Sequence, residues 1–328
     1  MLLVTRFIFN VHQPPSERYL EITMPHSTRP ISYPDDLPLL SRLVHQSPAS
    51  HPHVVDLPYR LASWAFDDPR NGRLWFDSSG GLAAWAVLQT PFWMLDFAVA
   101  PGSQCLPEVL AWAEATAAEL AQEPEGHACW FAAVLETQPE TIRALQQAGW
   151  ADISSDPESP WSQVLLKLAE DAAPPAPTLP DGFTLRPLAG AGEVGAYVDL
   201  HRRVFESRNM TPAWRLRTLQ RPEYRPEMDL VIESPEGRLA AFCVGWYDPA
   251  GPGGLPAAQV EPMGVDEAFR GLGLGSAILN EQIRRMRALG ARQIFVETDD
   301  DRGPALALYH AAGFQNLHRI PIFRKDAG

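Results

Sequence analysis

The chain contains few cysteines, and nothing in their spacing suggests a metal site or a set of disulfides. Its 328 residues include only Cys105, Cys129 and Cys243, and none of them belongs to a C-x-x-C pair. This pattern lacks the spacing of a zinc site or of a disulfide framework. Scattered cysteines are typical of a reducing compartment, so we expect a cytoplasmic protein that binds no metal. The nine histidines are scattered as well, and each is best explained as a solvated or packed side chain.

Long apolar runs and an excess of basic residues are also absent. No run approaches the roughly 18 residues that a membrane helix requires, so no membrane partner is expected. The chain has 27 basic and 40 acidic residues, which gives a net charge of −13. Nucleic-acid binding requires a basic face, and the composition therefore argues against that class of partner. The negative charge favours cationic partners, although solubility explains it equally well. None of these features indicates the oligomeric state.

A proline-rich stretch divides the chain near its middle. Residues 169–182, AEDAAPPAPTLPDG, contain four prolines, four alanines and almost nothing apolar to bury. Such a segment behaves as an extended, semi-rigid spacer. We therefore predict one domain over residues 24–168 and a second over residues 183–328. Residues 1–23 are predicted to be an N-terminal extension, because Arg6 interrupts their apolar start and no small-residue cleavage site follows.

The two predicted domains repeat the same patterns in the same order. Each has a hairpin whose second strand is entered by G-x-L-A-A-aromatic, in LWFDSSGGLAAWAVL (74–88) and LVIESPEGRLAAFCVGW (230–246). A strand ending in valine, a helix and a further strand follow in both. Each copy then ends a short helix in Ala-Gly-aromatic, at residues 148–150 and 312–314. This repetition predicts a duplicated α/β unit.

Only the second copy has glycines between its valine-ending strand and the next helix. VDEAFRGLGLGSAIL (265–279) contains three alternating glycines, where the first copy reads AVAPGSQCLPEVLAW. If the turn alone required them, both copies would be expected to keep them. Successive backbone amides at a helix N-terminus, where glycines leave no Cβ in the way, bind anions, above all a pyrophosphate. The spacing does not fit a dinucleotide fingerprint, since Ser276 or Ile278 stands at the third glycine position, although Glu297 suits a ribose-binding acid. A Walker A loop is excluded because no Gly-Lys-Ser/Thr follows.

Two motifs together resemble the GNAT superfamily of acetyl-CoA-dependent N-acetyltransferases. The first, Arg/Gln-x-x-Gly-x-Gly/Ala, reads RGLGLG (270–275), and the second, A-x-x-L-Y-x-x-x-G-F, reads ALALYHAAGF (305–314). They lie one strand and one helix apart, as in the family. The resemblance covers residues 183–325 by motif and reaches residues 24–168 only through the duplication. It implies two tandem GNAT-like domains of α/β (α+β) class, each a mixed, mostly antiparallel sheet flanked by helices.

The resemblance also implies where acetyl-CoA binds as a co-substrate. The loop amides would hold its pyrophosphate, and the strand AQVEPMGV would splay from its neighbour to admit the pantetheine arm. Pro262 in that strand predicts an edge or a bulge. Arg302 replaces an asparagine that is frequent in the family, and it either contacts phosphates or belongs to a solvated helix entrance. The expected cofactor-binding residues are Met263, Gly264, Val265, Arg270, Gly271, Leu272, Gly273, Leu274, Gly275, Ser276 and Arg302; core packing explains Met263 and Val265 equally well.

Two side chains are the candidates for proton transfer. Tyr309 matches the tyrosine of the family and would protonate the departing CoA thiolate. The first copy has Leu145 at that position, so it is predicted to be silent. Glu261, on the strand beside the thioester, is the candidate base, and Glu297 is a weaker alternative. The resemblance thus implies direct acetyl transfer to a primary amine of a small molecule. A protein or peptide acceptor and a CoA-binding module without turnover are the alternatives. The Arg- and aromatic-rich segment 205–229 would shape the acceptor pocket, and it would equally suit a helix packed on the sheet or on the other domain.

Overall fold

The two halves of the chain form the same succession of strands and helices in a computed structural model, which describes residues 26–48, 51–124 and 126–327. The predicted extension 1–23 lies outside these residues. The first half contains β1 (Ser27–Pro30), α1 (Leu37–Gln46), α2 (Leu57–Arg60), β2 (Gly72–Phe76), β3 (Leu82–Gln89), β4 (Met94–Val99), α3 (Leu106–Leu120), β5 (Cys129–Ala133), α4 (Pro139–Gln147), β6 (Ala151–Asp152) and β7 (Ser162–Leu168). The second contains β8 (Thr184–Pro187), α5 (Val194–Phe205), α6 (Pro212–Leu219), β9 (Asp229–Glu233), β10 (Leu239–Asp248), β11 (Ala257–Val265), α7 (Leu274–Ala288), β12 (Gln293–Asp299), α8 (Gly303–Ala311) and β13 (Phe314–Asp326).

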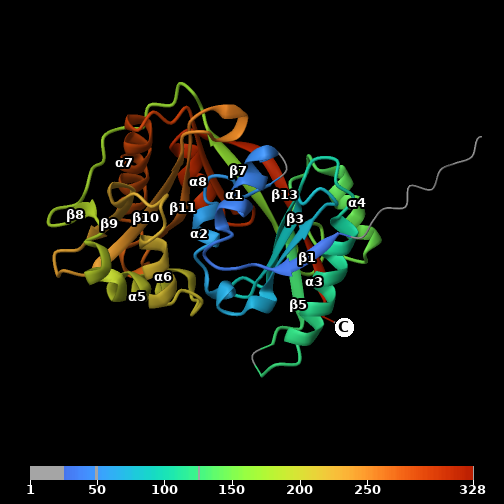
Figure 1. The fold of residues 1–328 in the computed structure, drawn as a ribbon. Coiled ribbons are helices and arrows are strands. Elements are labelled where there is room, and N and C mark those ends of the chain that lie inside the picture. The colour runs from blue at the N-terminus through green and yellow to red at the C-terminus, as the bar shows by residue number, and fades with distance from the viewer. Residues whose placement is uncertain (1–25, 49–50, 125, 328) are drawn as a thin grey trace, which may run out of the picture.

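The strands are mixed and mostly antiparallel, as expected, but they form one continuous sheet rather than a separate sheet in each domain. Its order is β1-β2-β3-β4-β5-β13-β7-β12-β11-β10-β9-β8, with β6 paired to β13 outside this path. Among the described pairs, only β4–β5 and β11–β12 run parallel. In Figure 1, α7 and the pair α3 and α4 lie at opposite ends of the molecule, with α1 and α2 between them. No helix within the described ranges has both the length and the apolar character needed to cross a membrane.

Helix α7 shows how the sequence pattern places an element. Leu279, Ile283 and Met286 recur at helical spacing and are fully buried in a core that the helix forms with β9, β10 and β11. The helix ends at Ala288, and Gly290 follows with a φ of 94°, which a residue without Cβ adopts easily. The periodicity and the C-terminal glycine therefore place α7, and with it the glycine loop at its N-terminus, against the second half of the sheet.

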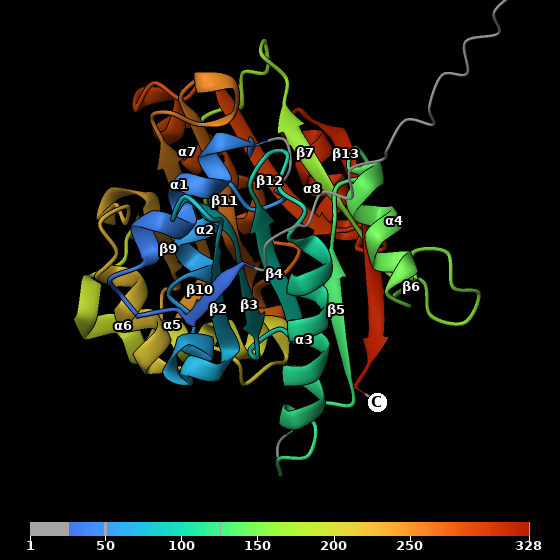
Figure 2. The ribbon, with the colours of Figure 1, turned by 45° about the vertical axis from the view of Figure 1, so that its right-hand side comes forward.

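Each half of the chain contributes a strand to the other half of the sheet. Strand β7 belongs to the first half but lies between β12 and the beginning of β13. The end of β13 pairs in turn with β5, so Ile322 and Phe323 are buried on the side of the first half. Figure 2 shows β7, β12 and β13 side by side, with the end of β13 running along β5. The linker between Leu168 and Thr184 contains no helix or strand. The domain limits at residues 168 and 183 stay a prediction.

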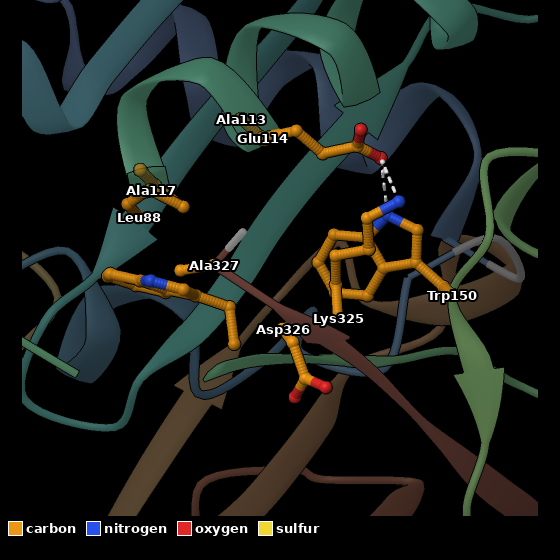
Figure 3. Close-up of a pocket in the computed structure, with 9 residues that line it drawn as sticks. Leu88, Ala113, Glu114, Ala117, Trp150, Lys325, Asp326 and Ala327 are labelled. Atoms are coloured by element: carbon orange, nitrogen blue, oxygen red, sulfur yellow. Dashed lines mark hydrogen bonds and ion pairs between the residues drawn. The ribbon is translucent and has the colours of Figure 1, made fainter. Parts of the chain in front are cut away.

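Side chains near the end of β13 attach the exchanged strand to the first half. Lys325 donates a hydrogen bond to the Ala148 carbonyl at 2.5 Å, and its Nζ lies 3.3 Å from the Glu114 carboxylate. The same carboxylate accepts a hydrogen bond from Trp150 Nε1 at 3.1 Å. Figure 3 shows Lys325 and Trp150 converging on Glu114 of α3. The Ala-Gly-Trp end of α4 is therefore linked to the C-terminal strand of the other half.

Aromatic side chains also join the two halves. The Tyr59 ring of α2 stacks on Trp214 of α6, with centroids 5.2 Å apart, and Phe92 meets the same indole edge-on at 5.4 Å. Trp64 Nε1 donates a hydrogen bond to the Asn209 carbonyl at 2.9 Å. One core cluster accordingly contains residues of α1, α2 and β3 together with residues of α5, α6 and β10. Segment 205–229 thus packs on the first half rather than covering its own sheet alone.

Candidate active site

Strands β11 and β12 separate at the point where the candidate base lies. Their parallel pairing ends at Val260 and Val296, and β11 continues to Val265 without a partner on that side. On the other side a bulge is present, because the pairing with β10 skips both Glu261 and Pro262. The bulge expected from Pro262 is therefore confirmed. Trp246 Nε1 donates a hydrogen bond to the Glu261 carbonyl at 2.7 Å and holds the backbone at this point.

The glycine loop forms the opening of α7. Gly271 and Gly273 have φ angles of 79° and 78°, and no heavy atom lies within 4 Å of the place where a Cβ would be. No side chain among the described residues caps the first turn of α7. The amides from residue 271 to residue 276 are therefore positioned to bind an anion at a helix N-terminus. Arg270 Nε donates to the Val265 carbonyl at 3.4 Å, which ties this loop to the end of β11.

A cavity of about 430 Å³ lies beside the separated strands and has walls from both halves of the chain. From the second half it is lined by Glu261, Met263, Glu297, Arg302 and Tyr309, among others. The first half contributes His53, Asp56, Tyr59, Arg60, Phe92, Trp93, Trp161 and Gln163. The exchanged strand β7 supplies the last of these, and Trp161 Nε1 just before it donates to Asp299 Oδ1 at 2.9 Å. The strand exchange therefore helps to build the wall of this cavity.

Glu261 and Tyr309 both line the cavity, and burial shifts the pKa of each. Burial, together with the charges of Asp56 and Glu297, raises the pKa of Glu261 to about 8. Burial, with smaller contributions from Cys243 and Glu261, raises the pKa of Tyr309 above its ordinary value. The tyrosine is thus a neutral hydrogen-bond donor, while the glutamate titrates near neutral pH. A carboxyl and a phenol with these properties suit a base and an acid respectively.

A model of the acetyltransferase (GNAT) family matches residues 196–314. That range contains the glycine loop, the separated strands, Glu261 and Tyr309. Residues 196–314 are a GNAT acetyltransferase domain. The predicted family is confirmed for these residues by the family model, and solved structures that superpose on both halves confirm the predicted fold class.

The chain has relatives among curated proteins and solved structures. Mycothiol acetyltransferases from Saccharomonospora viridis and Kineococcus radiotolerans are 29% and 33% identical over 150 and 144 residues, which are 44% and 42% of this chain and 49% and 44% of theirs. The chain thus spans about half the length of these relatives. A GCN5-related N-acetyltransferase from Sphaerobacter thermophilus superposes with a TM-score of 0.63 at 21% identity, covering 92% of this chain and 96% of that one. A tandem GNAT protein from the clavulanic acid biosynthesis pathway gives 0.64 at 16% identity, covering 92% and 99%.

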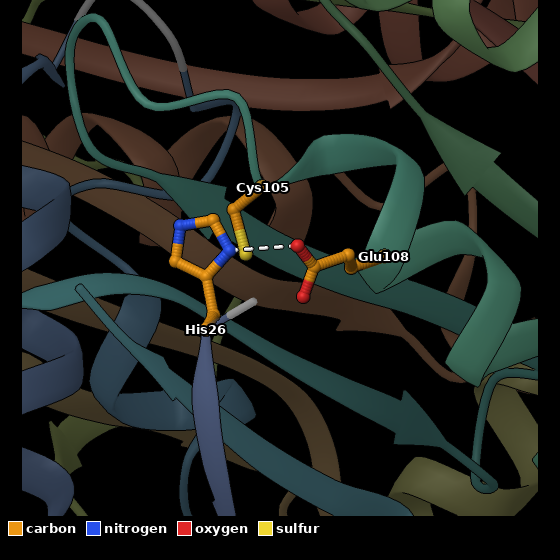
Figure 4. A group of neighbouring side chains, drawn as sticks. All are labelled: His26, Cys105 and Glu108. Atoms are coloured by element: carbon orange, nitrogen blue, oxygen red, sulfur yellow. Dashed lines mark hydrogen bonds and ion pairs between the residues drawn. The ribbon is translucent and has the colours of Figure 1, made fainter. Parts of the chain in front are cut away.

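The matching place in the first half differs from the GNAT loop in three ways. Pro107 lies in the first turn of α3 and offers no amide. Glu108 places a carboxylate at that helix N-terminus and accepts a hydrogen bond from His26 Nδ1 at 2.7 Å (Figure 4). Leu145, fully buried, occupies the position of Tyr309. A phosphate there would meet a carboxylate and one amide fewer, and the silent first copy stays a prediction.

The other predicted cofactor-binding residues lie around the loop and the separated strands. Leu272 is 45% exposed and Leu274 is buried, and because a leucine side chain has no hydrogen-bond donor, either residue would contact an anion through its backbone amide. Gly264 packs closely on helix α5, since a Cβ there would lie 2.3 Å from Val204 Cγ1. Arg302 lines the cavity and pairs with Asp299 at 2.7 Å. The roles assigned to these residues stay predictions.

Sequence reasoning did not assign a role to the charged residues that the first half places in the cavity. His53 Nδ1 lies 3.0 Å from Asp56 Oδ2 and 3.9 Å from Glu297 Oε2. Burial and Arg60 lower the pKa of His53, but the charges of Asp56 and Glu297 outweigh them and raise it. Arg60 forms a two-pronged ion pair with Asp96, at 2.7 Å for each bond. The signal in the sequence was HPHVVDLPYR, an otherwise apolar segment carrying four ionisable groups besides its tyrosine.

Proposed function

We propose that the protein transfers the acetyl group of acetyl-CoA to a primary amine of a small molecule. The observation that carries this proposal is the meeting of Glu261 and Tyr309 in one cavity, at the point where β11 leaves β12. The loop that opens α7 lies near both elements, since a Cβ on Gly275 would be 3.4 Å from Leu308 Cδ2 and 3.6 Å from Val265 Cγ2. The thioester would lie along β11, with its pyrophosphate on the amides of residues 271–276 and its pantetheine arm against residues 263–265. The relatives named mycothiol acetyltransferases support acetyl transfer as the reaction class.

The two side chains account for the proton movements of the reaction. Glu261, once ionised, accepts a proton from the amine, and the amine nitrogen attacks the thioester carbonyl. A carbon–nitrogen bond forms, a tetrahedral intermediate collapses, and the carbon–sulfur bond breaks. Tyr309 donates its proton to the departing sulfur, and the phenolate regains a proton from solvent. Backbone amides near the β11 bulge would stabilise the oxyanion of the intermediate.

The shape of the cavity favours a small acceptor over a protein or peptide. About 430 Å³ is within the range of small-molecule pockets, and residues of both halves line it. A protein acceptor would require an open groove beside Glu261. The presence of both Glu261 and Tyr309 in the cavity also supports turnover over a module that binds CoA without reaction. The acceptor itself is identified by a turnover screen across polyamines, aminoglycosides, amino acids and peptides, read by thiol release.

Replacing Gly273 with alanine tests the cofactor site. Its φ of 78° is in the left-handed region, where an alanine costs about 1–2 kcal/mol, although the space for a methyl group is open. The loop would leave the conformation in which its amides converge, and restoring it corresponds to a loss of roughly 5- to 30-fold in affinity. We expect the KM for acetyl-CoA to rise by about tenfold, measured by thiol release with an acceptor found in the screen.

Gly102 provides the matched control. It lies in the corresponding loop of the first half, has the same φ of 78° and also has open space around it. Gly102→Ala should therefore impose the same strain and leave the KM for acetyl-CoA unchanged. Equal effects of the two substitutions would mean that only stability had been altered, and the proposed pyrophosphate site would be wrong.

A further inference from the structure

We infer that Asp56 and His53 of the first half and Glu297 of the second form a binding site for the ammonium group of a ring-bearing acceptor. All three side chains line the cavity that also contains Glu261. The site exists only where the two halves meet. This inference rests on the proposed function in one respect, which is that the bound cation is the acceptor of the acetyl group.

Two buried carboxylate oxygens in this site lack a hydrogen-bond donor. Among the described residues, Asp56 Oδ1 and Glu297 Oε2 are buried and have no hydrogen-bond partner. The Asp56 side chain is 2% exposed and that of Glu297 is 8% exposed. His53 Nδ1 bonds to the other Asp56 oxygen, and at 3.9 Å it is too far from Glu297 for a hydrogen bond. Burying a carboxylate oxygen without a donor is costly, whereas an ammonium ion supplies three donors and a positive charge.

The charges around the cavity are also unbalanced. Arg302 is paired with Asp299, and Arg60 is paired with Asp96. Asp56, Glu261 and Glu297 then remain, together with the imidazoles of His53 and His201. Burial and nearby arginines lower the pKa of His201 to about 3, so this imidazole stays neutral. Three carboxyl groups against one imidazole that can carry charge leave negative charge for a cationic ligand to neutralise once the carboxyls ionise. The same arrangement would repel an anionic acceptor.

Aromatic side chains indicate what kind of group carries the ammonium ion in that ligand. Tyr59, Phe92, Trp93, Trp161 and Trp214 line the same cavity, and four of them come from the first half. Flat aromatic faces bind rings by stacking and attract cations through their π-systems. We therefore expect a primary ammonium ion on a short arm from a ring, with the ring against these side chains and the nitrogen between Asp56 and Glu297.

A pair of ligands that differ only in charge tests this site. Phenethylammonium and 2-phenylethanol share a ring and an arm, and they are titrated calorimetrically into the full chain saturated with CoA, where no acetyl transfer occurs. The wild-type protein should bind phenethylammonium at least tenfold more tightly than 2-phenylethanol. Asp56→Asn and Glu297→Gln should each weaken phenethylammonium binding at least tenfold and leave 2-phenylethanol binding unchanged. Glu140→Gln, which removes one charge from the exposed surface of α4, is the matched control and should change neither.

The outcomes separate this inference from the proposed function. Unchanged binding of 2-phenylethanol shows that the cavity of a variant is intact, so a lost preference for the cation then reports the missing charge. Equal binding of the two ligands by the wild-type protein, binding of neither, or a preference retained in both variants would overturn the ammonium site. Acetyl transfer is not measured in this titration, and its failure in the turnover screen would leave the result standing.

Discussion

Glu261→Gln should lower kcat/KM by about 10²- to 10⁴-fold, the usual contribution of a general base. The pH profile carries the more specific result. Because the pKa of Glu261 is raised to about 8, the free enzyme holds this carboxyl protonated at neutral pH. The wild-type kcat/KM should therefore rise with pH and reach half of its plateau near pH 8. In the variant, kcat/KM should no longer rise around pH 8. Any rise with pH that is still seen should follow the pKa of the acceptor amine.

The pH dependence of the unfolding free energy shows whether Glu261→Gln loses activity because the base is missing or because the fold is damaged. The carboxyl has an ordinary pKa of 4.5 when unfolded and about 8 when folded, so the folded state binds the proton more tightly. The free energy of unfolding of the wild-type protein should consequently fall as pH rises from about 4.5 to about 8. Glu261→Gln removes the contribution of Glu261 to that dependence, leaves that of Glu297, whose pKa burial also raises, and should unfold at a higher temperature than the wild type at pH 8.5. A variant that keeps the rise of kcat/KM around pH 8 would assign that titration to another group.

Tyr309→Phe should lower kcat by about 10²-fold and leave the affinity for acetyl-CoA nearly unchanged. The substitution removes one hydroxyl from a side chain that is 7% exposed and otherwise packs edge-on against Phe314, with ring centroids 5.9 Å apart. Stability should change little, because the ring contacts are kept. The measurement combines single-turnover thiol release with a calorimetric titration of acetyl-CoA.

The leaving group provides a sharper readout for the same tyrosine. If Tyr309 protonates the departing sulfur, an acetyl thioester of a more acidic thiol depends less on that proton, because its thiolate leaves more readily. The loss of kcat caused by Tyr309→Phe should therefore become smaller as the thiol becomes more acidic. A defect of constant size across thioesters, or a kcat equal to that of the wild type, would show that Tyr309 is not the general acid. Leu145→Phe at the corresponding position of the first half is expected to leave kcat unaffected.

The parts of the site that lie within one half could be predicted from the sequence. The glycine loop requires backbone without Cβ at a helix N-terminus, and the tyrosine helix requires a fixed helical spacing. Both requirements are local, and each motif is one continuous segment of the chain. Pro262 similarly indicated the bulge beside Glu261. These features depend on neighbours in the chain, so a linear pattern retains them.

The parts that depend on the packing of one half against the other could not be predicted. His53 and Asp56 lie in a short apolar segment, and only the wall formed with Glu297 buries them together. The apolar patterns of β7 and β13 fit either half of the sheet. From the sequence, each strand is therefore assigned to its own half. Nothing in the spacing of Trp161 or Gln163 indicated that an exchanged strand would bring them to a cavity of the second half.

Calorimetric titration of the full chain with acetyl-CoA counts the acetyl-CoA sites. We expect one site per chain, because the loop of the second half offers open amides while Pro107 and Glu108 occupy the matching helix in the first. Gly273→Ala should weaken that site and Gly102→Ala should not. Two sites per chain would contradict the silent first half, and binding of NAD without binding of acetyl-CoA would contradict the assignment of the glycine loop altogether.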